Sequence, residues 1–175
     1  MPEARKKDNP VRIDMTPHPL DKSGRVTLKQ GQRDLLGNEV VLTYGPRTSM
    51  RMFATDDFET YKADIIAGWG SNLMDPDWDQ VTRQLIDCKF ACKIDAQGRL
   101  RIPANFLDRS GLADKKDAEV EIIHREQMGY FEIWPRGQVG IPEDPDDPFY
   151  RARRLLSDRL REQKAASAGE GRTNA

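Results

Sequence analysis

An internal repeat constrains the fold of this chain more than any other feature of its sequence. The segment 19–29 is repeated as the segment 93–103, with apolar residues at matching alternate positions. Both copies contain an aspartate, a glycine three residues later and an arginine directly after it: Asp21, Gly24 and Arg25 in the first copy, and Asp95, Gly98 and Arg99 in the second. A repeat of this length predicts two equivalent half-domains.

Each copy predicts a tight turn followed by a strand. Aspartate at the first position and glycine at the fourth are typical of a type I turn with a glycine bulge. Side chains alternate along a strand, so one face of each strand is apolar and the other polar. The polar face carries Arg25, Thr27 and Lys29 in the first copy and Arg99 and Arg101 in the second. A cationic binding face is one reading, and an ion pair between each arginine and the aspartate four residues before it is the other.

The charge of the chain is nearly balanced overall but uneven locally. The 175 residues are 33% charged and 37% hydrophobic, with a formal net charge of −1. This composition is typical of a soluble protein, and the net charge alone argues against nucleic-acid binding. However, residues 89–101 contain two lysines and two arginines against one aspartate. A local basic patch of this kind can still bind phosphate.

The sequence offers no signal for membrane insertion, secretion or metal binding. No apolar run approaches the length of a membrane span, and the charged first ten residues do not resemble a signal peptide, so we expect a cytoplasmic protein. Cys88 and Cys92 could suggest a metal site. The alternation of Phe90, Cys92 and Ile94 instead predicts a strand with a buried thiol, and the two histidines lie in different copies. We therefore predict no metal, no cofactor and no small-molecule substrate.

The remaining elements predict a mostly β, α+β fold. Each copy reads as two strands, a short helix (30–36 or 104–110) and two more strands, with inward-facing helices at 56–67 and from Asp75 onward. The second copy also has Pro103 at the start of its short helix, where the first has Lys29. The expected divisions are a flexible arm at 1–14, a first repeat at 15–58, a helical connector at 59–88, a second repeat at 89–140, and an acidic linker, a basic helix (149–164) and a disordered tail within 141–175.

Several of these features together resemble the MraZ family of bacterial transcriptional regulators. They are the two Asp-x-x-Gly-Arg units, the continuation Leu-Arg-Ile-Pro at 100–103, the segment Tyr-Phe-Glu-Ile-Trp-Pro at 130–135 and the intervening helices. The resemblance covers about residues 13 to 140, and Lys29 departs from the proline usual in the family. It implies two AbrB-like halves of the swapped-hairpin, double-psi barrel type. It also implies ring-like homo-oligomers that bind repeated boxes of double-stranded DNA upstream of the division and cell-wall genes, including the protein's own gene.

The resemblance also suggests the site residues. The family links its Asp-x-x-x-Arg motif to DNA contact, which by position implies a role for Asp21, Arg25, Asp95 and Arg99. Strand parity alone adds Lys29 and Arg101. We therefore expect DNA contacts from the four cations, with the turns held by Asp21, Gly24, Asp95 and Gly98.

Two other functions compete with a cytoplasmic, nucleoid-associated regulator. One aspartate in each half could form a paired carboxylate site like that of the aspartic proteases, which needs two close acids that share a proton. An arginine four residues after each aspartate would instead keep it ionised, so we predict no enzyme. A non-catalytic interaction module, such as an antidote with an AbrB-like fold, stays open because 149–160 carries an apolar stripe.

Overall fold

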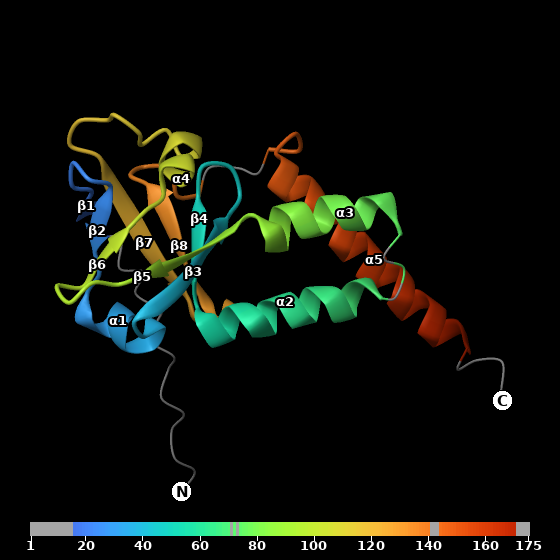
Figure 1. Ribbon diagram of the computed structural model, residues 1–175. Helices are drawn as coiled ribbons and strands as arrows, with labels where there is room; N and C mark the ends of the chain where they lie inside the picture. Colours follow the sequence, from blue (N-terminus) through green and yellow to red (C-terminus); the bar gives the residue numbers. More distant parts are fainter. Residues whose placement is uncertain (1–15, 71, 73, 141–143, 171–175) are drawn as a thin grey trace, which may run out of the picture.

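The computed structural model describes residues 16–70, 72, 74–140 and 144–170. Its architecture is α+β and combines a curled six-stranded antiparallel sheet with a separate two-stranded ribbon (Figure 1). The sheet contains, in spatial order, β1 (His18–Pro19), β7 (Glu119–Arg125), β8 (Tyr130–Pro135), β4 (Met50–Ala54), β3 (Glu39–Tyr44) and β5 (Lys89–Lys93). The ribbon pairs β2 (Arg25–Thr27) with β6 (Arg99–Arg101).

The two sequence copies interleave within the sheet. The first strand of each copy pairs with a strand of the other: β1 with β7, and β5 with β3. The last strands of the copies, β4 and β8, meet in the middle, where Arg51 lies opposite Glu132. Exchanging the two copies therefore leaves the strand order unchanged, as expected of a duplicated unit. The exact residue limits of the repeats remain a prediction.

The helices fall into two groups. Two short helices, α1 (Gln30–Leu36) and α4 (Ala104–Arg109), each follow a ribbon strand. The others are α2 (Thr55–Trp69), α3 (Pro76–Thr82), which continues as the π-helical turn η1 (Arg83–Asp87), and α5 (Pro148–Glu170); a single 3-10 turn, η2 (Glu126–Met128), joins β7 to β8. Figure 1 shows α2, α3 and α5 together on one side of the sheet.

Apolar residues form separate cores on the two sides of the sheet. Under the ribbon, Val26 and Leu100 lie opposite each other in the β2–β6 pair and are fully buried, as strand parity predicts. On the other side, Phe53 and Phe58 pack α2 against the sheet. A third cluster joins α2, α3 and α5 through Ile65, Trp69, Trp78, Val81, Leu85, Ile86, Phe149 and Ala152.

Both long helices extend beyond their expected ends. Helix α2 continues through Gly68 to Trp69, because this glycine serves packing: a Cβ there would lie 3.0 Å from the Leu160 side chain of α5. Helix α5 runs to Glu170 rather than ending near 164. The predicted tail therefore begins later, and its last residues, 171–175, lie outside the described residues, as does the arm at 1–14.

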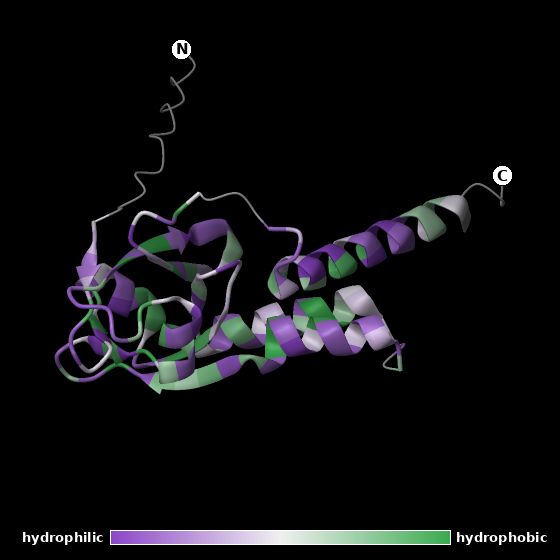
Figure 2. Ribbon diagram, turned by 90° about the horizontal axis from the view of Figure 1, so that it is seen from above, coloured by the Kyte–Doolittle hydropathy of each residue, from purple (hydrophilic) through white to green (hydrophobic). Residues whose placement is uncertain are grey.

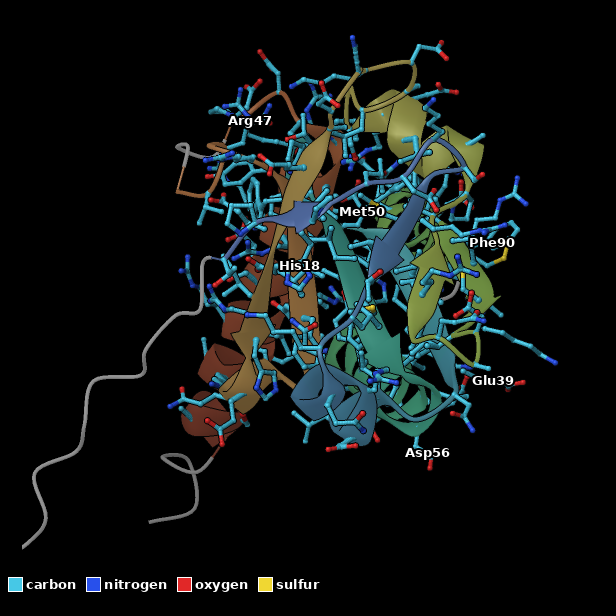
Figure 3. All side chains as sticks on the ribbon, turned by 90° about the vertical axis from the view of Figure 1, so that its left-hand side faces the viewer. His18, Glu39, Arg47, Met50, Asp56 and Phe90 are labelled. Atoms are coloured by element: carbon cyan, nitrogen blue, oxygen red, sulfur yellow. The ribbon has the colours of Figure 1, made fainter. Side chains whose placement is uncertain are left out.

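Strand β5 corrects the expectation that Phe90 is buried. Its register places Phe90 opposite Leu42 and Cys92 opposite Val40, so these side chains share the core side of the sheet. Because β5 is an edge strand, Phe90 is nevertheless 51% exposed. Figure 3 shows it at the outer margin of the molecule. Cys92 is half-buried, and burial raises the pKa of its thiol to about 11, so the thiol stays protonated.

Within the described ranges, none of the helices is long and apolar enough to be a membrane span. Figure 2 shows hydrophilic residues along most of α5, the longest helix.

Candidate functional site

Both Asp-x-x-Gly-Arg units form the same backbone turn. In the first, the Asp21 carboxylate accepts hydrogen bonds from the backbone N–H groups of Ser23 (2.8 Å) and Arg25 (2.9 Å). In the second, Asp95 accepts from those of Gln97 and Arg99, both at 2.9 Å. The aspartate thus bonds two backbone donors within its own turn, as side chains of this type commonly do.

The glycine of each turn is required by its backbone conformation. Gly24 has φ of 71° and Gly98 has φ of 77°, a left-handed region that other residues enter only at a cost. Each glycine also lies under a helix side chain. A Cβ at Gly24 would lie 2.8 Å from Leu107 of α4, and one at Gly98 would lie 2.9 Å from Arg33 of α1. The positive φ of each glycine, and the hydrogen bond from its N–H to the carbonyl of the aspartate three residues earlier, agree with the predicted tight turn and glycine bulge.

The two turns lie at opposite ends of the ribbon, and a polar face extends between them. Along this face Arg25 is directly opposite Arg101, and Thr27 is opposite Arg99. Backbone hydrogen bonds from Leu28 to Gly98 and from Ile102 to Gly24 continue the pairing into each turn. The ribbon thereby brings cations of both copies onto one surface.

The predicted cations differ in how firmly they are held. The Arg99 side chain donates to the Asp95 carboxylate (2.8 Å) and to Gln97 (3.1 Å). For Arg25, the described part of the chain contains no corresponding ion pair. Arg101 and Lys29 are exposed. Within the described residues, the ion pair between the motif arginine and the aspartate four residues before it is therefore present in the second copy only.

The turn geometry lowers the pKa of both aspartates. The largest cause in each is the backbone N–H of the arginine four residues later, Arg25 for Asp21 and Arg99 for Asp95. The positive charge of the arginine adds to the effect but is not its main source. Two ionised carboxylates at opposite ends of a ribbon do not form the proton-sharing pair that an aspartic protease needs. Among the described residues, moreover, no group of histidine, cysteine and acidic side chains could hold a metal ion.

Sequence reasoning missed several cations close to the two turns. Lys115 and Lys116 lie in the loop before β7 and line one hollow of about 540 Å³ together with Lys22 and Arg101. The Arg33 side chain lies over Gly98 of the second turn. The two adjacent lysines occur in a stretch that the first copy lacks, and this insertion was the available signal.

Comparison with known proteins supports the resemblance that the motifs suggested. No protein-family model matches the chain. Curated proteins named transcriptional regulator MraZ do match: that of Thermoanaerobacter sp. (strain X514) is 26% identical over 117 residues, which is 67% of this chain and 79% of the relative. The protein of Alkaliphilus metalliredigens (strain QYMF) is 26% identical over 133 residues (76% and 87%). That of Xanthomonas campestris pv. campestris (strain 8004) is 28% identical over 106 residues (55% and 67%). The matches to curated MraZ transcriptional regulators thus agree with the resemblance that the motifs predicted.

Proposed function

We propose that the protein is a sequence-specific regulator that binds double-stranded DNA through the polar face of the β2–β6 ribbon. The observation that carries this proposal is the direct opposition of Arg25, which is half-buried, and Arg101, which is exposed, on the polar face of the ribbon. Like charges directly opposite across two strands destabilise a ribbon. A bound phosphate backbone would relieve that repulsion and release counterions.

The four predicted cations take different parts in this proposal. Arg25 and Arg99 begin their strands and contact bases or phosphates, while Lys29 and Arg101 add phosphate contacts. Asp21 and Asp95 fix the turns and make no DNA contact of their own. A single ribbon offers few contacts, so specificity requires several copies of this surface on several DNA boxes.

The proposed assembly is a ring-like homo-oligomer of AbrB-like, swapped-hairpin subunits. Its support is the exposed edge of β5, because an unpaired edge strand is a template for association. The exposed Phe90 side chain and Cys92 line a surface hollow of about 490 Å³ along this edge. Light scattering at micromolar concentration tests this part, and a monomer mass would contradict it.

We further propose that the targets are repeated boxes upstream of the division and cell-wall gene cluster, including the protein's own gene. Such a regulator would act in the cytoplasm, in association with the nucleoid. These assignments follow the family and not the geometry of the ribbon.

The test is fluorescence anisotropy with a labelled duplex from upstream of the protein's own gene and a scrambled duplex of the same composition. We expect tighter binding to the upstream duplex, and loss of that preference in the double variant Arg25→Ala/Arg99→Ala. Arg83→Ala is the matched control, because Arg83 is an exposed arginine paired with Asp79 on the helical side. Equal binding of both duplexes by the wild type would contradict the proposal.

The alternative is a non-catalytic interaction or antidote-type module that uses the apolar stripe of α5. Within that stripe Phe149 and Ala152 are buried against α2 and α3. Leu160, near the end of the stripe, is 38% exposed. This internal use of the stripe favours the regulator.

A further inference from the structure

A cavity of about 590 Å³ lies on the helical side of the sheet, away from the ribbon. Its floor includes Arg51 of β4 and Tyr130 of β8, one wall includes Tyr61 of α2, and another includes Leu156 of α5. Figure 1 shows the two wall helices on the same side of the sheet. The volume is within the range of small-molecule sites. Helix α5 lies beyond residues 13–140, which carry the family resemblance, so the family motifs assign nothing to this cavity.

The polar part of the cavity wall is strongly cationic. Among the described residues, its charged members are four arginines and one glutamate: Arg47, Arg51, Arg125, Arg153 and Glu132. Figure 3 shows Arg47 in the loop between β3 and β4, at one end of the sheet. The other lining residues are mainly apolar or aromatic, including Ile65 and Leu156. The described lining therefore combines several cationic side chains with an apolar surface.

Arg51 is a buried cation with one hydrogen-bond donor that lacks a partner. It is only 6% exposed, and its Nε has no hydrogen-bond partner within the described structure. Its guanidinium lies between two aromatic rings, 4.4 Å from the centre of Tyr130 and 4.7 Å from that of Phe149. Both rings stabilise the charge. The Tyr61 side chain also forms a hydrogen bond with Arg51, so the donor that still lacks a partner is Nε.

Glu132 is opposite Arg51 across the two central strands but does not neutralise it by contact. The Glu132 carboxylate accepts a hydrogen bond from the indole N–H of Trp134 at 3.0 Å. Among described residues, no ion pair joins it to Arg51. Burying a charge without a paired partner is costly, and proteins normally provide one. The missing partner would be an anion.

We infer that this cavity binds a small amphipathic anion: an acidic group held by Arg51 and Arg153, and an apolar body packed against Tyr61, Ile65 and Leu156. The ligand would bridge the sheet and α5, since Arg51 belongs to the first and Arg153 to the second. The proposal concerns binding only and includes no chemical step. The proposal does not rest on DNA binding and is tested without DNA.

The first test compares two fluorescent probes that share an aromatic body. One is 8-anilinonaphthalene-1-sulfonate, which carries an acidic group, and the other is N-phenyl-1-naphthylamine, which is neutral. We expect one saturable site per chain for the sulfonate and at least about tenfold weaker binding of the neutral probe. Equal affinity for the two would mean that the cavity is merely an apolar gap, and would overturn the proposal.

The second test uses variants of the full-length chain. Arg153→Ala should weaken sulfonate binding several-fold without affecting the neutral probe, whereas its neighbour Arg154→Ala should change neither, because Arg154 does not line the cavity. Ser157→Trp, on the exposed mouth of the cavity, should abolish binding of both probes. Sulfonate binding that survives Ser157→Trp would locate it elsewhere and contradict the proposal.

Arg51→Met separates the ligand role from a structural one. Circular dichroism and thermal unfolding first establish whether this variant folds. A folded variant should lose at least about tenfold in sulfonate affinity, and unchanged affinity would make Arg51 a structural cation only. Should the variant unfold, Arg51→Lys serves instead: it keeps the charge but loses the planar donors, so weaker binding is again expected. Displacement of the probe by 1-naphthoate or by 1-naphthyl phosphate then identifies the acidic group as carboxylate or phosphate.

Discussion

The two turns of the repeat have the same backbone but hold their arginines differently. Asp21 bonds only backbone N–H groups, including that of Arg25. Asp95 makes the same backbone bonds and also accepts from the Arg99 side chain, which bonds Gln97 as well. Duplication has thus retained the part of the motif that shapes the chain, while the restraint on the guanidinium is present in one copy only.

The residues that cover the two turns differ in a related way. Leu107 of α4 lies over Gly24, and Arg33 of α1 lies over Gly98. These two side chains occupy equivalent positions of the repeat, so one turn is covered by an apolar group and the other by a cation. The second turn therefore combines a fixed arginine with an additional positive charge.

The largest expected effect of this difference is on DNA affinity. We expect Arg99→Ala to weaken specific binding more than Arg25→Ala does, each by about 1–3 kcal/mol if the arginine contacts a base. Arg99 is already ordered by Asp95 and loses less side-chain entropy on binding. Anisotropy titrations of both variants on one-box and several-box duplexes measure the difference, which should grow with the number of boxes.

The same titrations at several salt concentrations separate the possible contacts. An arginine that only neutralises phosphate should weaken binding to all sequences alike and reduce the salt slope by about one. Wild-type affinity in Arg25→Ala/Arg99→Ala would show that the repeated motif is purely structural.

The next largest effect concerns the stability of the turns. We expect Gly24→Ala and Gly98→Ala each to lower the free energy of unfolding by about 1–2 kcal/mol, because alanine is strained at positive φ. The two losses should be similar, because an added Cβ would lie 2.8 Å from Leu107 at Gly24 and 2.9 Å from Arg33 at Gly98. Urea unfolding measures both.

Gly31 is the matched control for these substitutions. It lies within α1, and a Cβ there would meet nothing within 4 Å. Gly31→Ala should therefore stabilise the protein, by about 0.5–1 kcal/mol. A loss at Gly31 equal to that at Gly98 would mean that the turn conformation is not the cause.

The third effect is a difference between the two aspartates in how the free energy of unfolding depends on pH. Their pKa values are lowered on folding from 3.8, so each carboxylate stabilises the fold above that value, and the contribution is lost as the pH falls through the folded pKa. We expect Asp95→Asn to destabilise the protein at about pH 6, and the gap from wild type to shrink towards about pH 3. Asp21→Asn should show the same trend with a smaller gap, because no arginine side chain is bonded there. Equal gaps at pH 6 would show that the Asp95–Arg99 ion pair adds nothing to stability.

Local patterns predicted the repeat units well because their causes are local. The Asp-x-x-Gly spacing specifies the turn through one side chain and one positive φ, and alternation predicted the buried Val26 and Leu100. The short helix at 30–36 was also correct, since Gly37 ends it with φ of 73°. In each of these places the conformation depends on neighbours within a few residues.

The errors arose where distant segments decide the structure. Gly68 predicted a helix end, but the approach of Leu160 from α5 explains why a glycine is needed there. Phe90 has the correct orientation but lies on an edge, which strand alternation cannot indicate. The cavity around Arg51 could not be predicted either, because its walls come from segments about a hundred residues apart.

The smallest expected effect tests the one asymmetry on the polar face of the ribbon. Thr27 and Arg101 are equivalent positions of the repeat, so Arg101→Thr would place a threonine opposite an arginine at both ends of the ribbon. Removing the Arg25–Arg101 opposition should raise the free energy of unfolding by about 0.2–1 kcal/mol at low salt. Thermal and urea unfolding measure this gain, and Thr27→Arg, which creates a second opposed pair, should give a loss of similar size.

The salt dependence of the stability gain shows whether it comes from reduced charge repulsion or from the better strand propensity of threonine. A gain that comes from repulsion should largely disappear at about 1 M salt, where exposed charges are screened, whereas a propensity effect should persist. The same variant should bind DNA more weakly, with a salt slope lower by about one, because a phosphate contact is lost. A variant that is both more stable and weaker in binding would mean that the ribbon keeps two opposed arginines for the sake of an anionic partner. Unchanged DNA affinity would instead remove Arg101 from the binding surface and leave the contacts to Arg25 and Arg99.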